Sequence, residues 1–282
     1  MAPTNPGASF EALGGVGPVV ISVPHGGRAY PAAMMQDLRV PAAAVMALED
    51  RLVDLVARDA RTAEPMLVQT RPRAWIDLNR DERERDPVID LGATASGRAS
   101  AKLRSGLGLV PRRVPGHGDI WTRRFTGAEI DERIEEDHRP YHRALATRLA
   151  EARAQFGVAV LLDLHSMPPL GAPGLVPRVV IGDRHGTTAA TRFVRRIEAE
   201  VRGAGIAVTR NAPYAGGHIV ERHGDPRQGI HAIQLELDRS LYLDAALEAP
   251  GAGFEATVTL VRRILLALAA EALGQPVAMA AE

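Results

Sequence analysis

The sequence contains no cysteine and a single lysine, Lys102, among its 282 residues. The lack of cysteine excludes disulfide bonds, thiolate catalysis and cysteine-bound zinc, so any metal must be bound by His, Asp and Glu. Arginine supplies the rest of the basic charge, and the 34 basic residues match the 34 acidic ones. Because this balance provides no broad basic surface, we expect neither nucleic acid nor an anionic membrane as a partner.

Long apolar runs are also missing. The longest candidate, residues 258–273, is interrupted by Arg262 and Arg263 and is typical of an amphipathic helix rather than a membrane span. Residues 1–7 carry neither the basic nor the apolar stretch of a secretory signal. We therefore expect a cytoplasmic protein, and the pattern leaves its oligomeric state open.

Short apolar, β-branched runs alternate with longer helical patterns, and no repeat divides the chain. Strands are expected at 19–23, 66–70, 74–78, 158–164, 177–181, 206–209 and 230–237, helices at 42–63, 126–154, 187–202 and 254–273, and a long loop at 86–121. This alternation predicts an α/β fold in which a central mixed β-sheet is flanked by helices on both faces. We expect one domain over residues 1–282, with its core at about 15–272.

Polar residues fall where the predicted strands end, which is where active sites gather in open α/β sheets. His25 follows the first buried strand, His165 follows the most apolar strand, and Glu236 ends a late strand; Asn79 and Arg80 end another segment. Two histidines and a carboxylate form a common catalytic zinc set, and a separate carboxylate can act as general base and then general acid. Hydrogen-bonded structural histidines and a strand-end ion pair are the alternative interpretations.

Other residues are ambiguous by pattern alone. Arginines such as Arg73 can bind a substrate carboxylate by two parallel hydrogen bonds, or can be structural. His218 lies in a Gly-Gly-His turn that suits either a substrate-contacting loop or an ordinary turn. His138 and His142 have the i,i+4 spacing of helical metal ligands, but no acidic residue lies between them, and surface histidines are expected there.

Six short motifs carry a resemblance to a known family: Ser22-Val-Pro-His-Gly-Gly27, Leu48-Glu-Asp-Arg51, Arg73-Ala-Trp-Ile-Asp-Leu-Asn-Arg80, Asp163-Leu-His-Ser166, Gly216-Gly-His218 and Glu236-Leu-Asp-Arg-Ser-Leu-Tyr242. In this order they resemble the N-formylglutamate amidohydrolase family, from about residue 19 to residue 242. The resemblance implies a phosphorylase/hydrolase-like fold, similar to zinc carboxypeptidases and aspartoacylase. It also implies one zinc ion per chain, or another divalent metal in its place.

By this resemblance, His25 and His165 bind the metal. The carboxypeptidase pattern places an acidic ligand three residues after the first histidine, but Arg28 occupies that position here. The acidic ligand must therefore come from elsewhere, and Glu49 and Asp50 lie in a predicted helix. Asp50 is preferred because the family resembled carries an aspartate there, with Glu49 as the alternative.

The resemblance also implies the reaction, which is hydrolysis of the amide bond of a small N-acyl amino acid. The preferred substrate is N-formyl-L-glutamate, which gives L-glutamate and formate, with Glu236 as the general acid and base and Arg73 polarising the carbonyl. The substrate contacts that it implies are Asn79, Arg80, His218 and Arg239. Two alternatives stay open: the same chemistry on another N-acyl or N-formimidoyl amino acid or a short peptide, and a non-catalytic binding domain on the same fold.

Overall fold

The computed structural model describes residues 9–94, 100–172, 174 and 176–275. The chain divides into two compact units whose segments alternate along the sequence. Unit 1 comprises Met1–Ala12, Pro24–Arg51 and Leu67–Ala144, and unit 2 comprises Leu13–Val23, Leu52–Met66 and Leu145–Glu282. None of the helices in the described ranges is long and apolar enough to cross a membrane.

Unit 2 contains most of the β-sheet. Five of its strands lie side by side in the order β2 (Val19–Val23), β6 (Ala159–Met167), β9 (Ile230–Asp238), β7 (Val179–Gly182) and β8 (Val208–Arg210). β2, β6 and β9 run parallel, whereas β7 is antiparallel to β9 and parallel to β8. β2 and β6 are buried along their whole length, as expected for strands covered on both faces. The predicted mixed sheet is therefore confirmed.

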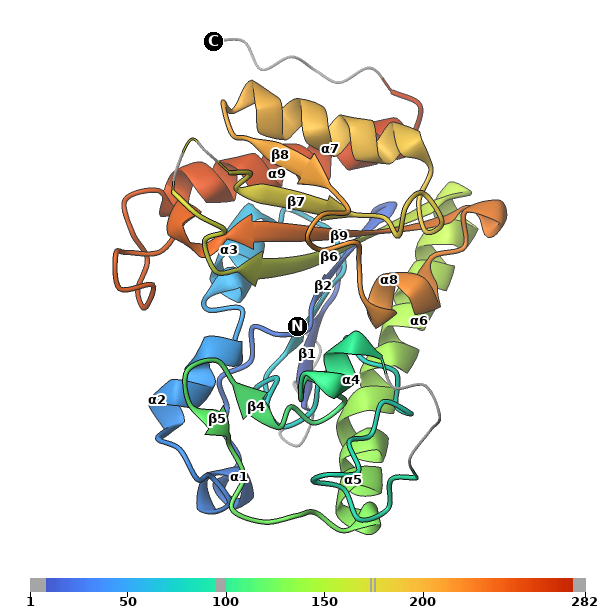
Figure 1. Cartoon of the computed structure of the whole chain (residues 1–282). Coiled ribbons are helices and arrows are strands. Elements are labelled where there is room, and N and C mark those ends of the chain that lie inside the picture. The colour runs from blue at the N-terminus through green and yellow to red at the C-terminus, as the bar shows by residue number, and fades with distance from the viewer. Residues whose placement is uncertain (1–8, 95–99, 173, 175, 276–282) are drawn as a thin grey trace. The chain divides into compact units, whose positions relative to one another are not determined.

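Helices cover the strands of unit 2. α9 (Phe254–Ala272) packs against both α3 (Val53–Ala60) and α7 (Thr191–Gly203), and α3 and α9 also contact β2 and β6. The short helix α8 (His218–His223) contacts β6 and β9, and in Figure 1 it lies on the other side of these strands from α7 and α9. The sheet is thus flanked on both faces, which confirms the predicted fold class.

The boundary between the units falls inside β1 (Phe10–Leu13) and β3 (Met66–Gln69). These two strands extend the sheet order to β1-β3-β2-β6-β9-β7-β8. Apart from one long helical run, the other elements that the structure describes in unit 1 are short. They are α1 (Ala32–Gln36), α2 (Ala42–Val45), the 3₁₀ turn η1 (Met46–Leu48), α4 (Ala101–Arg104) and the hairpin of β4 (Arg113–Val114) with β5 (Gly118–Asp119). Part of the predicted loop 86–121 is therefore structured, and residues 95–99 of it lie outside the described residues.

One helical run connects the two units. α5 (Gly127–Arg133) begins at a capping box of Thr126 and Glu129, as predicted. It continues through the π-helical turn η2 (Ile134–His138) into α6 (Arg139–Phe156). The capping residues satisfy backbone groups that the first turn leaves without helical partners, which explains why the sequence located this start correctly.

Two predicted elements are wrong. The helix predicted at 42–63 is broken because Glu49 has an extended backbone (φ −69°, ψ 148°) and Leu52 lies in the left-handed region (φ 57°). The strand predicted at 74–78 is instead a series of turns. The spacing of apolar residues predicted a helix in the first stretch and a strand in the second. This spacing does not show where tertiary contacts bend the backbone. The first stretch carries the predicted site residues Glu49 and Asp50, and the second lies between the predicted site residues Arg73 and Asn79.

Candidate functional site

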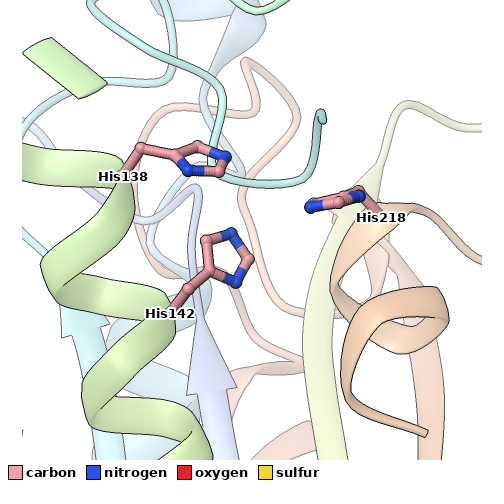
Figure 2. A group of neighbouring side chains, drawn as sticks. All are labelled: His138, His142 and His218. Carbon is pink, nitrogen blue, oxygen red and sulfur yellow. The ribbon is translucent and has the colours of Figure 1, made fainter. Parts of the chain in front are cut away.

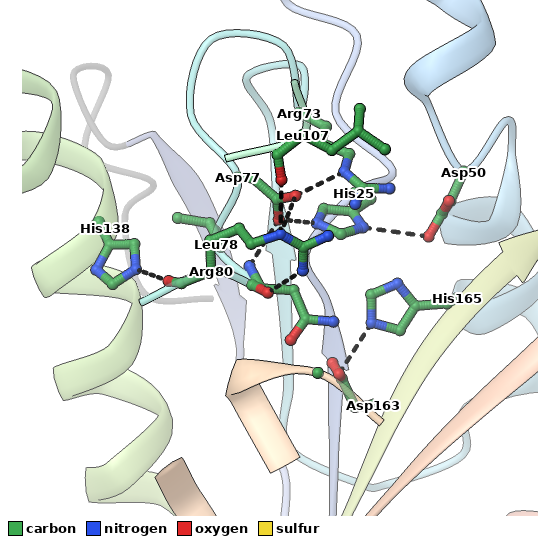
Figure 3. Close-up of polar contacts among 12 residues, drawn as sticks. His25, Asp50, Arg73, Asp77, Leu78, Arg80, Leu107, His138, Asp163 and His165 are labelled. Carbon is green, nitrogen blue, oxygen red and sulfur yellow. Dashed lines mark hydrogen bonds and ion pairs between the residues drawn. The ribbon is translucent and has the colours of Figure 1, made fainter. Parts of the chain in front are cut away.

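His25 lies two residues after the end of β2, in the turn that opens the second segment of unit 1, and is buried. Two carboxylates flank its ring (Figure 3). Asp77 Oδ1 lies 2.7 Å from His25 Nε2, and Asp50 Oδ2 lies 3.5 Å from Nδ1. The backbone N–H of Asp50 also donates to the carbonyl of His25 at 3.0 Å. The imidazole is therefore fixed from both ends, with a carboxylate beside each ring nitrogen.

Asp77 is the buried centre of this group. It accepts hydrogen bonds from Arg73 Nε at 2.9 Å and from the backbone N–H of Asn79 at 2.9 Å. Burial by itself would raise the pKa of Asp77, but Arg73, His25 and Arg80 outweigh it and hold this pKa well below its ordinary value. Because an ionised carboxylate only accepts hydrogen bonds, His25 donates Nε2–H to it, and the lone pair of His25 is on Nδ1.

Glu49 and Asp50 lie in the break between η1 and α3, not in the helix expected there, and their side chains make different contacts. Glu49 accepts hydrogen bonds from the Tyr30 hydroxyl at 2.6 Å and from Arg51 Nη1 at 3.0 Å. Burial and the Glu49 carboxylate raise the pKa of Tyr30. Asp50, in contrast, is directed toward Nδ1 of His25. Of the two carboxylates, Asp50 is therefore the one placed to share a cation with His25.

The predicted substrate residues Asn79 and Arg80 lie in the same unit and are buried. Arg80 donates from Nε to the carbonyl of Leu107 at 2.9 Å and from Nη1 to the carbonyl of Asn79 at 2.6 Å. Within the described part of the chain, no hydrogen bond uses its Nη2 group. The guanidinium is thus held in one orientation, and Nη2 is the donor that remains for an anionic ligand.

His165 belongs to unit 2 and lies within β6, which extends beyond the predicted end at 164. Asp163 is two residues earlier, so its side chain leaves the same face of the strand. Asp163 Oδ2 lies 2.9 Å from His165 Nε2, and its Oδ1 accepts a hydrogen bond from Ser22 Oγ at 2.7 Å. Figure 3 shows this pair. As for His25, a buried carboxylate accepts the Nε2–H of the imidazole. The proton is then on Nε2, so the lone pair that could bind a metal is on Nδ1.

Glu236 is the register partner of His165 in the neighbouring parallel strand β9. Paired residues of adjacent strands lie on the same face of a sheet, so the carboxylate and the imidazole face the same side. Gln234 fixes Glu236 by donating from Nε2 to Oε1 at 2.7 Å, and it accepts a hydrogen bond from the backbone N–H of Gly217 at 2.8 Å. Glu236 is thus a buried carboxylate of fixed orientation on the face of the sheet that carries His165. A carboxylate held in this way can act as a general base.

Two weaker predictions also fall in unit 2. His218 is the first residue of α8, so the predicted Gly-Gly-His turn ends at Gly217 and His218 itself is helical. Arg239 follows β9 in the 3₁₀ turn η4 (Arg239–Leu241) and donates from Nε to Ser166 Oγ at 3.3 Å. Because β6 and β9 are neighbours, Arg239 lies at the same end of these strands as His165 and Glu236.

The histidine pair of the long helix is not on the surface, contrary to expectation. His138 and His142 are both buried, and their ring centroids are 4.4 Å apart (Figure 2). His138 Nε2 lies 2.8 Å from the carbonyl of Arg80, and His142 Nε2 lies 3.0 Å from the carbonyl of Leu78. The i,i+4 spacing on a polar helix resembles a solvated face, but the irregular segment 75–80 packs over these residues.

Within unit 1 the structure brings together His25, Asp50, Arg73, Asn79 and Arg80, and within unit 2 it brings together His165, Glu236 and Arg239. Sequence reasoning missed Asp77, Asp163 and Gln234 as their partners. Asp163 and Gln234 had a signal, since each lies two residues before its partner on a strand. Asp77 had none, because 52 residues separate it from His25.

The family model described as N-formylglutamate amidohydrolase matches residues 17–243. The chain belongs to this family. The resemblance seen in the six motifs is therefore confirmed, and the matched residues include every predicted site residue from His25 to Arg239.

Individual members of the N-formylglutamate amidohydrolase family are similar over most of the chain. An N-formylglutamate deformylase from Pseudomonas aeruginosa is 29% identical over 264 residues, covering 90% of this chain and 93% of the relative. One from Pseudomonas putida is 30% identical, covering 80% and 82%. The crystal structure of N-formylglutamate amidohydrolase from Ralstonia eutropha JMP134 superposes with a TM-score of 0.83 at 32% identity, covering 94% of this chain and 97% of that one.

Proposed function

We propose that this chain hydrolyses N-formyl-L-glutamate to L-glutamate and formate, using one zinc ion per chain. Its family and the names of its relatives from Pseudomonas aeruginosa and Pseudomonas putida support the reaction. The single structural observation that carries the proposal is the pair of carboxylate–histidine contacts, Asp77 to His25 and Asp163 to His165. Metal-binding histidines commonly donate their second ring N–H to a carboxylate in this way.

The proposed zinc ligands are His25, Asp50 and His165. The fit rests on the chemistry of the donors, since each residue offers one atom that can bind a divalent cation. Both histidines direct the lone pair of Nδ1 away from the carboxylate on Nε2, and two imidazoles with one carboxylate are a common catalytic zinc set. Zinc bound there would polarise the formyl carbonyl and lower the pKa of the attacking water.

Glu236 is proposed as the general base and then the general acid. It takes a proton from the water that attacks the formyl carbon and gives a proton to the leaving amine nitrogen as the C–N bond breaks. Its register pairing with His165 and its hydrogen bond from Gln234 support this role, because both fix the carboxylate on the face that carries the histidine. General acid–base catalysis of this kind contributes about 10²–10⁴-fold to a rate.

Arg73 is proposed to stabilise the negative charge that develops on the carbonyl oxygen. Asn79 and Arg80 are proposed to hold a carboxylate of the substrate, and the rigid guanidinium of Arg80 with its remaining Nη2 group supports this assignment. Further contacts to the substrate are assigned to His218 and Arg239. A dicarboxylate such as N-formyl-L-glutamate suits a site with several arginines, because each carboxylate finds a cationic partner.

The proposed ligands come from both compact units. We therefore infer that the two units act as one catalytic domain over residues 1–282, with its core at about 15–272. This follows from the proposed ligand set, since His25 and Asp50 belong to unit 1 and His165 belongs to unit 2.

The test is the release of formate from N-formyl-L-glutamate by the purified protein, with zinc measured on the same sample. A panel of N-formyl, N-acetyl and N-formimidoyl amino acids and a short peptide separates the preferred substrate from the same chemistry on another one. Glu236→Gln should keep one zinc per chain and lose turnover, whereas His165→Ala should lose zinc. A Glu236→Gln variant that stays fully active would refute the role of Glu236. A wild-type protein with no stoichiometric metal would favour a non-catalytic binding domain.

A further inference from the structure

The segment 75–80 carries three residues of the proposed site but has no regular secondary structure. Asp77 holds His25, and Asn79 and Arg80 bind the substrate in the proposed mechanism. Only a few backbone hydrogen bonds stabilise the segment, such as Asp77 N–H to the carbonyl of Leu109 at 2.7 Å and Arg80 N–H to the carbonyl of Asp77 at 3.2 Å. Because buried carbonyls of irregular segments require partners outside a helix or sheet, the geometry of 75–80 depends on side chains around it.

The helical run of α5, η2 and α6 supplies such side chains. In η2 the N–H of Arg139 donates to the carbonyl of Ile134, which is the i→i+5 bond of a π-turn. A π-turn accommodates one more residue than an α-helical turn, so residues five apart come to the same side of the helix. Arg133 and His138 have this spacing, and His142 follows His138 at the i,i+4 spacing of the α-helix. One side of the run thus presents three polar side chains in a row.

All three of these side chains contact backbone carbonyls of the segment 75–80. Arg133 Nη1 donates to the carbonyl of Trp75 at 3.0 Å, His142 donates to that of Leu78 and His138 to that of Arg80. Since a carbonyl only accepts hydrogen bonds, both histidines must present Nε2–H to it. His142 therefore fixes the peptide group that precedes Asn79, and His138 fixes the peptide group that follows Arg80. The two residues Asn79 and Arg80 lie between these fixed peptide groups.

Trp75 anchors the other end of the segment. Its indole N–H donates to Asp137 Oδ2 at 2.9 Å, and the Arg133 guanidinium carbon lies 3.7 Å from its ring centroid. Asp137 belongs to η2 and is fully buried. The segment is thus held at both ends by one helical run, and the turns between these ends carry Asp77.

We propose that His138 and His142 are positioning residues that set the orientation of Asn79 and Arg80 for substrate binding. This inference rests on the proposed function, because it assigns substrate binding to Asn79 and Arg80. The two histidines are 0% and 1% exposed, so solvent does not replace a donor that is lost. If the N–H donor of either histidine is removed, the carbonyl that it contacts, Arg80 for His138 and Leu78 for His142, loses this hydrogen bond while it is buried. The segment then moves to form another hydrogen bond.

The test compares variants that keep or remove the N–H donor. His138→Gln and His142→Gln retain a side-chain N–H near the position of Nε2, whereas His138→Leu and His142→Leu fill the space without one. We expect each Leu variant to raise the KM for N-formyl-L-glutamate about tenfold, because a small displacement of binding groups is costly. Zinc should stay at one per chain with kcat changed by no more than about twofold, and the Gln variants should recover most of the affinity.

A matched control is His231→Leu, which removes a buried histidine whose Nδ1 accepts a hydrogen bond from the backbone N–H of Ala190 at 3.2 Å, far in sequence from 75–80. We expect it to lower the thermal midpoint as the Leu variants do, with KM unchanged. Amide hydrogen exchange provides a readout that needs no substrate. The N–H of Arg80 should exchange faster in His138→Leu and His142→Leu, and at the wild-type rate in His231→Leu.

Unchanged KM and unchanged exchange of the segment in both Leu variants would overturn the proposal. So would a second zinc ion per chain that disappears in His142→Leu, because the pair would then bind metal instead of positioning the segment. If the wild-type protein hydrolyses no N-acyl amino acid, the proposed function fails, while the exchange measurement still decides whether the histidines hold the segment.

Discussion

His25 and His165 each have a carboxylate on Nε2, but the two carboxylates lie at very different distances along the chain. The partner of His165 is two residues away on the same strand, and the partner of His25 is 52 residues away in an irregular segment. On a strand, residues two positions apart lie on the same face, so β6 brings Asp163 and His165 together without help from other elements. A loop needs support from other elements, and in unit 1 the helical run of α5, η2 and α6 provides it.

The group around Asp77 includes residues with two different proposed roles, metal binding and substrate binding. Asp77 contacts His25, Arg73 and the backbone of Asn79, so it connects a proposed metal ligand to proposed substrate-binding residues. Asp163 contacts His165 and Ser22, neither of which is proposed to bind substrate. If the proposed roles are correct, substitutions in the group around Asp77 affect both metal and substrate binding, whereas substitutions in the pair of Asp163 and His165 affect the metal alone. We call these the loop group and the strand group.

The largest expected effect comes from the acidic ligand of the loop group. Asp50→Ala should reduce zinc from one per chain to a trace after dialysis, because the cation loses the only carboxylate of its proposed ligand set. The matched variant Glu49→Gln removes the charge of the other candidate and keeps one oxygen that can accept a hydrogen bond from Tyr30 or Arg51. It should keep its zinc. The measurement is metal content by mass spectrometry. Retention of zinc in Asp50→Ala together with loss in Glu49→Gln would reassign the ligand to Glu49.

A second prediction separates the two carboxylate partners. Asp77→Asn and Asp163→Asn should each weaken zinc binding about 10–100-fold, because each removes the charge that orients and polarises a ligating histidine. Only Asp77→Asn should also raise KM in zinc-saturated enzyme, since of these two carboxylates it is Asp77 that contacts Arg73 and Asn79. Competition with a chelator measures the first effect and steady-state kinetics the second. Equal KM values in the two variants would remove the distinction between the groups.

The smallest expected effect concerns the start of the supporting helix. Thr126→Ala removes the capping side chain of α5 and should lower the free energy of unfolding by about 1 kcal/mol. Calorimetry should show a midpoint about 2–4 °C lower, with zinc content and KM as in the wild type. Ser100→Ala, which removes the cap of the four-residue helix α4, is the control and should shift the midpoint less. A large rise in KM in Thr126→Ala would mean that the helix start itself positions the loop group.

Much of the fold was predictable because it depends on local patterns. The buried strands β2, β6 and β9 follow from continuous apolar runs, and the start of α5 follows from Thr126 and Glu129. The break at Glu49 to Leu52 was not predictable, since Leu52 adopts a left-handed backbone despite an apolar side chain that suits a helix. The helix α8 was missed because its six residues give too short a pattern.

The proposed site divides in the same way. The sequence placed His165 and Glu236 near the ends of strands, and the register of β6 with β9 makes them neighbours. It offered both Glu49 and Asp50 as acidic ligands, and the contacts of Tyr30 and Arg51 with Glu49 distinguish the two. It also predicted surface positions for His138 and His142, because a helical pattern does not reveal which segment packs over it.

The sequence by itself determined the family, the sheet and the residues available for chemistry, because apolar runs and short motifs are properties of neighbouring residues. Only the tertiary structure decided which carboxylates lie beside His25 and which side chains support the segment 75–80. The physical reason is that these contacts join residues tens of positions apart, such as His25 with Asp77 and His138 with Arg80. Their geometry is set by packing and by the need of buried polar groups for partners, neither of which a local pattern records.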